Sequence, residues 1–436
     1  MPRCRQRDRR KGYMNEQIER FNMREPPRRQ KWYLRLLTWI LCYPEVWLRR
    51  TRIRRINMDG LKPPYILLSN HNAFLDFKVA VAAMFPHRSN FIVAIDGFIG
   101  REGLLRNVGC ICKRKFTNDI VMIKHLQQVV KNGDILVVYP EARYSLCGTT
   151  AVLPDSIGKL CKFLKIPVVT LIIHGHHINS PFWNLKKRGV KPTEATLTQL
   201  FTAEALAETK AGEINEQIRE AFVYDDFAWQ KERGIRILYR KRAEGLHKVL
   251  YQCPHCLTEF KMSSSGTKLR CDACQKTWTL GIYGELSADG GETVFSHIPD
   301  WYEWERQQVR DEVLSGTYSF SGPVIVDSLP NAERFIRLGE GFMTHNGEGF
   351  HVSGKTENGE PFEMTKPVAS LYSCHIEYDY LGKHGDCVDL NTLTDTWYIY
   401  PFGCAFSVTK MALATEELYM AYRKAAEAKQ PARAAL

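Results

Sequence analysis

Short apolar runs that end in polar or charged residues constrain the fold of this chain most strongly. Residues 65–68, the run ending at Val137-Val138 and residues 166–171 each read as a buried strand, and charged side chains follow the first two. Strands of this kind are typical of α/β sheets, in which ligands bind at the carboxyl ends of the strands. We therefore predict an α/β domain, with a mixed sheet flanked by helices and functional residues just after its strands.

The first of these junctions carries a candidate histidine–carboxylate pair. His71 and Asp76 stand five positions apart, directly after the strand predicted at residues 65–68. A histidine acts as a base when a partner fixes its tautomer and stabilises the imidazolium, and a carboxylate is the usual partner. Taken alone, a histidine such as His71 more often caps a helix start. The chain has no Gly-x-Ser-x-Gly elbow, which argues against a serine hydrolase with a covalent acyl-enzyme.

Four sequence blocks together resemble a known family. They are Asn-His-x-x-x-x-Asp at 70–76, a basic segment at 109–114, Tyr-Pro-Glu-Ala-Arg-Tyr-Ser at 139–145 and Ile-Pro-Val-Val-Thr-Leu at 166–171. Their order, spacing and chemistry resemble the glycerolipid acyltransferases, which include the 1-acyl-glycerol-3-phosphate (lysophosphatidic acid) acyltransferases. The resemblance covers roughly residues 55–225, and the first block is its most specific part.

The resemblance assigns a role to each matching residue. It implies that His71 is the general base, that Asp76 orients it, and that Arg114, Glu141 and Arg143 bind the substrate, with the arginines on the acceptor's phosphate. The family's third block usually reads Pro-Glu-Gly-Thr-Arg-Ser, whereas here the arginine comes one position early. Such a shift redirects a side chain on a strand or tight turn, so the role of Arg143 stays open.

The implied reaction suits these residue types. A thioester has a good leaving group, so the obstacle is an acceptor hydroxyl that must lose its proton as it attacks, and a histidine base removes that obstacle. We expect backbone N–H groups at the helix start after His71 to stabilise the oxyanion. The resemblance implies acyl-CoA or acyl carrier protein as the donor and a lysophospholipid, favouring 1-acyl-glycerol 3-phosphate, as the acceptor. The alternatives are glycerol 3-phosphate, another lysolipid, or a non-catalytic membrane and partner binding protein.

A histidine cluster follows the fourth block. His174, His176 and His177 form a His-x-His-His sequence with no carboxylate or cysteine beside it. We interpret it as a loop after a strand rather than as a metal site.

All of the excess positive charge lies at the N-terminus. Residues 1–55 hold 17 Lys and Arg against 5 Asp and Glu, whereas the remaining residues hold 43 of each. This basic arm includes an aromatic and aliphatic stretch, residues 32–48, that is too short and interrupted to span a bilayer. We predict that it binds anionic lipids peripherally or monotopically at the cytoplasmic face of a membrane. An ordinary helix packed on the core is the alternative, and residues 1–30 are expected to stay disordered until they meet lipid.

Two Cys-x-x-Cys pairs predict a metal site. Cys253 and Cys256 are separated by 14 residues from Cys271 and Cys274, a spacing typical of zinc ribbons. Four thiolates leave no open position, so the zinc would be structural, although one iron could be held in the same way. Some ribbons bind nucleic acid, but the neutral balance beyond residue 55 argues against that partner. The 13 cysteines, an odd number, favour a reducing, cytoplasmic setting.

These patterns divide the chain into four parts. We predict a membrane-associating segment at 1–55, an acyltransferase domain at 56–248, a zinc ribbon at 249–284 and a β-rich domain at 300–436. Residues 200–250 read as helical. The last part alternates with period two over eight short runs, the final one at 405–408, and has Asn-Gly turns at 346–347 and 358–359. Ending in a helix over about 410–429, it resembles pleckstrin-homology-like modules by pattern alone.

Overall fold

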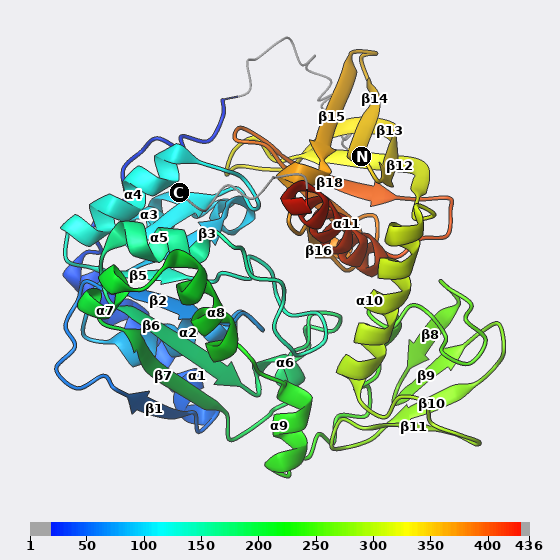
Figure 1. Ribbon diagram of the computed structural model, residues 1–436, viewed down its shortest axis with the longest axis horizontal. Helices are drawn as coiled ribbons and strands as arrows, with labels where there is room; N and C mark the ends of the chain where they lie inside the picture. Colours follow the sequence, from blue (N-terminus) through cyan, green and yellow to red (C-terminus); the bar gives the residue numbers. More distant parts are fainter. Residues whose placement is uncertain (1–18, 429–436) are drawn as a thin grey trace, which may run out of the picture.

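Three β-sheets divide the chain in the computed structural model, which describes residues 19–428 (Figure 1). The first sheet has seven strands, the second has four and the third has seven. Most of the arm predicted to be disordered, residues 1–18, lies outside the described residues.

The first sheet is mixed, as predicted. Its strand order is β1-β7-β6-β2-β5-β3-β4, and β1 and β7 run opposite to the other five strands. The strands are β1 (Arg52–Ile56), β2 (Ile66–Ser69), β3 (Ser89–Ala94), β4 (Cys110–Lys113), β5 (Ile135–Val138), β6 (Val168–His174) and β7 (Glu194–Phe201).

Helices cover both faces of this sheet because its central strands are apolar on both sides. Leu67 of β2 packs into a buried cluster with α2 residues, while its neighbours Ile66 and Leu68 pack into a second cluster with α4, α5 and α8. This alternation is the period of an extended strand. The helices of this domain are α1 (Trp32–Leu48), α2 (Leu75–Met84), α3 (Glu102–Asn107), α4 (Ile120–Lys131), α5 (Ile157–Leu164), α6 (His176–Asn179), α7 (Ala203–Glu208), α8 (Ala211–Ala221) and α9 (Asp226–Glu232).

The N-terminal segment is more ordered than expected. The described residues 19–30 run along the domain, with Phe21 buried against Phe98 at a ring separation of 5.5 Å. Helix α1 packs on α2. One face of α1 therefore lies on the core, as the alternative prediction of an ordinary helix expected. The basic run after it is β1, the edge strand of the sheet. Within residues 19–428, no helix combines the length and the apolar character that crossing a bilayer requires.

The second sheet is a small antiparallel meander that carries the cysteine pairs. Its order is β11-β10-β9-β8. Residues 233–250, expected to be helical, instead form turns and a single short 3-10 helix that lead into this sheet. The strands are β8 (Met262–Ser265), β9 (Lys268–Cys271), β10 (Thr277–Leu280) and β11 (Leu286–Ala288).

The third sheet is antiparallel throughout and ends in a long helix, as predicted. Its order is β15-β14-β13-β12-β18-β17-β16, and the two Asn-Gly turns join β13 to β14 and β14 to β15. The prediction of a strand at 405–408 is wrong, because the final helix already begins at Val408. The elements are α10 (Ile298–Ser315), β12 (Phe320–Ser328), β13 (Ile336–Asn346), β14 (Gly349–Thr356), β15 (Pro361–Pro367), β16 (His375–Glu377), β17 (Cys387–Asn391), β18 (Thr396–Pro401) and α11 (Val408–Ala428).

One buried apolar cluster joins the three parts. It contains Phe182 from the first, Trp278 from the second and Val326 from the third, and α10 packs against α11 on the right-hand side of Figure 1. The third part, called the C-terminal domain below, therefore packs directly against the mixed-sheet domain.

Candidate active site

The structure brings His71 and Asp76 together at the end of β2. Asp76 lies in the first turn of α2 and is fully buried, and its Oδ2 is 3.2 Å from Nδ1 of His71. The same oxygen accepts hydrogen bonds from the backbone N–H groups of Asn72 at 2.6 Å and Ala73 at 2.9 Å. These two N–H groups are therefore occupied, which corrects the expectation that amides directly after His71 would stabilise an oxyanion.

The protonation of Asp76 sets the tautomer of His71. Burial alone would raise the pKa of Asp76, but hydrogen bonds from His176 and His71 outweigh it and lower the pKa to about 2. An ionised carboxylate only accepts hydrogen bonds, so Nδ1 of His71 carries the proton. The Nε2 atom of neutral His71 then keeps its lone pair, as a base requires.

The His71 ring is held between two aromatic rings. Tyr139 stacks on it at 4.1 Å, Tyr144 lies tilted at 4.3 Å, and the His71 side chain is 21% exposed. The neighbouring Asn70 exchanges two hydrogen bonds of 2.9 Å with the backbone of Ile173 on β6. The imidazole is thus fixed in place yet reachable from outside.

Glu141 lies behind this loop. Its two oxygens accept hydrogen bonds from the backbone N–H groups of His71 at 3.0 Å and Ala151 at 2.9 Å. Burial raises the pKa of Glu141 to about 8 although both hydrogen bonds oppose the shift. Its contacts position the His71 backbone, and the predicted role in binding the substrate stays a prediction.

The structure does not bring Arg143 to this pair. Ala142 adopts a left-handed φ of 54°, a conformation that favours glycine, which the resembling family has here. The next side chain, Arg143, is buried and donates to Glu416 of α11 at 2.7 Å. Its described ion pair is with the C-terminal domain, so its predicted phosphate-binding role gains no support.

Arg114 is likewise bonded to the C-terminal domain. It follows β4, is 1% exposed, and donates to the carbonyl oxygens of Leu329 (3.0 Å), Pro330 (2.9 Å) and Thr394 (3.1 Å) and to the hydroxyl of Thr396 (2.7 Å). Four hydrogen bonds occupy both terminal nitrogens of the guanidinium group. The expected contact between Arg114 and an acceptor phosphate therefore stays a prediction.

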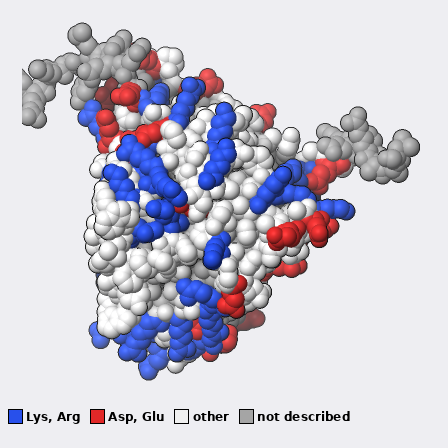
Figure 2. Space-filling model, turned by 90° about the vertical axis from the view of Figure 1, so that its left-hand side faces the viewer, with Lys and Arg blue, Asp and Glu red and all other residues white. Residues whose placement is uncertain are grey.

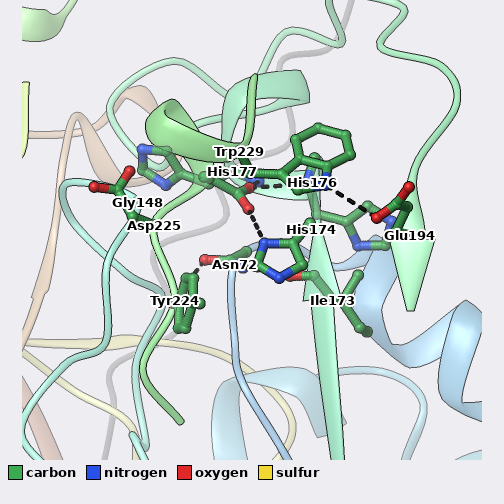
Figure 3. A network of polar contacts seen from close by, with 12 residues as sticks. Asn72, Gly148, Ile173, His174, His176, His177, Glu194, Tyr224, Asp225 and Trp229 are labelled. Carbon is green, nitrogen blue, oxygen red and sulfur yellow. Dashed lines mark hydrogen bonds and ion pairs between the residues drawn. The ribbon is translucent and has the colours of Figure 1, made fainter. Parts of the chain in front are cut away.

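Sequence reasoning missed a second histidine on Asp76. His176, at the start of α6, lies with its Nδ1 2.6 Å from Oδ1 of Asp76, and the polar network around His176 extends to α9 (Figure 3). His174 contacts Asp226 at 3.3 Å. The interpretation of this cluster as a plain loop is therefore wrong. Its carboxylates lie 100 and 52 residues away along the chain, so no local signal could have revealed them.

The four cysteines converge on one point in the second sheet. Their Sγ atoms all lie within 4.8 Å of one another, with Cys253 to Cys274 at 3.8 Å and Cys256 to Cys271 at 3.7 Å. Four sulfurs about 2.3 Å from a tetrahedral ion stand about 3.8 Å apart, so the spacing fits zinc, and one iron remains the alternative. A closed set of four thiolates suits a structural metal.

Comparisons with known proteins place the mixed-sheet domain in a family. Residues 49–174 match the family model described as Acyltransferase, so this part of the chain is an acyltransferase domain and the protein is an acyltransferase. Among solved structures, the chain is similar to the 1-acyl-sn-glycerophosphate (LPA) acyltransferase PlsC from Thermotoga maritima. That match has 14% identity and a TM-score of 0.35 and covers 47% of this chain and 79% of the other. No curated protein sequence matches.

Proposed function

We propose that the protein transfers an acyl group from acyl-CoA or acyl carrier protein to the free hydroxyl of a lysophospholipid, with 1-acyl-glycerol 3-phosphate as the favoured acceptor. The observation that carries this proposal is the imidazole of His71. Its Nδ1 is bonded to buried, ionised Asp76, while the partly exposed ring presents Nε2 as the free nitrogen.

The proposed step follows from that geometry. Nε2 of His71 takes the proton of the acceptor hydroxyl as the hydroxyl oxygen attacks the thioester carbonyl. The carbon–sulfur bond breaks and the thiolate leaves, so a new ester forms without an acyl-enzyme. Asp76 stabilises the imidazolium that forms, and the proton can then pass to the departing thiolate.

Membrane binding through α1 is part of the proposal. The outward face of α1 is apolar, with Trp32, Leu41 and Trp47 each about two-thirds exposed. Exposed arginines of β1 follow it directly in the chain, and Figure 2 shows Lys and Arg side chains gathered at the lower end of the molecule. Apolar side chains that enter the headgroup boundary beside arginines that reach anionic phosphates suit peripheral binding at the cytoplasmic face of a membrane.

A panel of substrates tests the reaction. The purified protein is supplied with several lysolipids, or with glycerol 3-phosphate, and with acyl-CoA or acyl-loaded carrier protein, and the lipids formed are identified by mass spectrometry. Replacing a general base typically lowers the rate by about 10²–10⁴-fold, and we expect this of His71→Ala. The matched control is His87→Ala, an exposed histidine just after α2. Full turnover in folded His71→Ala would refute the proposal.

The same panel tests a second candidate acceptor, another lysolipid without a phosphate monoester. It is favoured by one observation, namely that both arginines expected to bind phosphate are bonded to the C-terminal domain. Higher kcat/KM for a phosphodiester lysolipid than for 1-acyl-glycerol 3-phosphate would support this candidate.

Vesicle binding tests the membrane surface. Leu41→Glu places a charge on the exposed face of α1, whereas Leu314→Glu places one on an equally exposed leucine at the end of α10 (66% and 69% exposed). We expect only Leu41→Glu to weaken sedimentation with phosphatidylserine-containing vesicles. Equal binding by both variants would contradict this surface.

A further inference from the structure

We infer that His176 is a positioning residue for the base, acting through Asp76; this inference rests on the proposed function. His176 and Asp76 are both fully buried, and Nδ1 of His176 lies 2.6 Å from Oδ1 of Asp76. His71 uses the other oxygen. One carboxylate is thus held between two imidazoles, of which only that of His71 is exposed enough to meet a substrate.

The two oxygens of Asp76 are unequally supplied with donors. Oδ2 accepts from His71, Asn72 and Ala73, whereas Oδ1 accepts only from His176 among residues 19–428. A buried carboxylate oxygen without a donor is costly, and the group relieves that cost by rotating or taking up a proton. Either response would remove the partner that fixes His71 as the Nδ1–H tautomer. The hydrogen bond from His176 therefore preserves the tautomer that the base requires.

The backbone around His176 is fixed by a second buried carboxylate. Oδ2 of Asp226, in the first turn of α9, accepts from the N–H groups of Gly175 and His177, both at 3.0 Å. These residues flank His176 on either side. Figure 3 shows the histidine segment against α9, with Trp229 beside His174. Asp226 therefore anchors the turn that aims His176 at Asp76.

Gly175 gives this turn its shape. It adopts a φ of 92°, which ends β6 at His174 and lets α6 begin at His176. A Cβ at residue 175 would stand 3.0 Å from Thr193 and 3.1 Å from Trp229, so a larger residue would be strained and crowded. The direction of His176 is thus set by the backbone and not by a free rotamer.

His176 acts as a hydrogen-bond donor and not as an acid. Its Nε2 is buried with no hydrogen-bond partner among the described residues. A neutral ring tolerates such a site better than an imidazolium, which would bury a charged N–H without an acceptor. His176 is fully buried, so its effect on the rate passes through Asp76.

Three variants separate this role from ordinary packing. His176→Phe keeps the ring volume and removes the donor, and His176→Gln keeps a donor on a shorter reach. His345→Phe is the matched control, because His345 is a buried histidine of the C-terminal domain whose Nδ1 contacts Tyr318 instead of Asp76. Each is measured for kcat and KM across pH, with a thermal melt to report the fold.

We expect His176→Phe to lower kcat by about tenfold or more, as losses of such supporting contacts do, with KM nearly unchanged. The acid limb of its kcat/KM profile should move to lower pH, because a carboxylate that has rotated away or taken up a proton stabilises the imidazolium of His71 less. His176→Gln should recover part of kcat, and His345→Phe should stay within about threefold of the parent. An unchanged kcat and acid limb in folded His176→Phe would overturn the inference, as would equal losses in His176→Phe and His345→Phe.

A readout that needs no turnover separates this inference from the reaction. Nitrogen-15 NMR of labelled histidine should show His71 as the Nδ1–H tautomer in the parent protein and as a mixture in His176→Phe. An unchanged tautomer in His176→Phe would refute the positioning role even if the enzyme is active. A protein with no activity on any lysolipid that still showed the tautomer change would refute the proposed reaction alone.

Discussion

The histidine–aspartate pair and the two predicted phosphate-binding arginines differ in where their contacts lie. His71 and Asp76 are five residues apart, and every hydrogen bond of their side chains stays inside the mixed-sheet domain. Arg114 and Arg143 bond to residues at least 200 positions away, all in or beside the C-terminal domain. One set of motif positions therefore forms the proposed base and its partner, whereas the other set joins two domains.

The third sequence block contains this division within three residues. Glu141 turns inward and binds the His71 backbone, Ala142 takes the left-handed φ of 54°, and Arg143 points away to Glu416. Glu416 also accepts from Arg306 at 2.7 Å and Ser373 at 2.7 Å, so Arg143 enters a buried charged cluster. Nη2 of Arg143 is thus bonded to Glu416, while its Nε and Nη1 are buried without a partner among the described residues.

The largest expected effect is on the pair itself. Asp76→Asn keeps the shape but replaces one acceptor oxygen with an amide that only donates, so the Nδ1–H tautomer of His71 loses its partner. Comparable changes in other enzymes lower kcat by about 10⁴-fold, and we expect at least 10³-fold here. Asp155→Asn, at an exposed ion pair, is the control. A kcat within tenfold of the parent would break the comparison, because the pair would then be merely structural.

Arg143→Met tests the arginine side of the comparison. Removing one partner of a buried ion pair costs about 3–5 kcal/mol, and the contacts of Glu416 with Arg306 and Ser373 place this case at the lower end. We expect a loss of about 3 kcal/mol in the free energy of unfolding with KM for the acceptor nearly unchanged. Arg423→Met is the control. It removes one partner of an exposed ion pair on α11, the helix that carries Glu416, and should lower the free energy of unfolding by less than about 1 kcal/mol.

A raised KM for Arg143→Met without loss of stability would reverse this assignment. It would mean that Arg143 binds the acceptor in solution and does not hold the contact with Glu416 there.

Arg114→Met should have a smaller effect of the same kind. The variant leaves buried carbonyl oxygens, including those of Leu329 and Pro330, without a hydrogen-bond donor. Each buried oxygen that loses its donor costs about 1–3 kcal/mol. Partial relaxation of the loop should limit the total to about 2 kcal/mol. Denaturant unfolding measures it, and kinetics with phosphate-bearing and phosphate-free lysolipids provide the decisive control. A loss of kcat/KM confined to phosphate-bearing acceptors would restore the phosphate-binding role.

Features that depend on residues close together in the sequence were predicted. Side-chain contacts between residues far apart in the sequence were missed. The buried strands, the approach of His71 to Asp76, the four-cysteine cluster and the final helix follow from local spacing or periodicity. The contact between His176 and Asp76 spans 100 residues, and that between Arg114 and Thr396 spans 282. Whether a buried arginine meets a phosphate or a carbonyl is decided by tertiary packing, which residue spacing in one chain does not encode.

Glu141→Gln tests whether the carboxyl group of Glu141 is protonated, and therefore neutral, near physiological pH. The folded-state pKa of Glu141, about 8, lies above its unfolded value of 4.5, so folding takes up a proton between these two values. Its contribution to stability is fully present below pH 4.5 and is lost as the pH rises towards 8. Between pH 6 and pH 7 this loss is at most about 1.4 kcal/mol for one proton. Glutamine does not titrate, so over that interval the parent should lose more free energy of unfolding than Glu141→Gln. If the free energy of unfolding fell equally with pH in both proteins, Glu141 would already be ionised at pH 6. The loop behind His71 would then hold a buried charge.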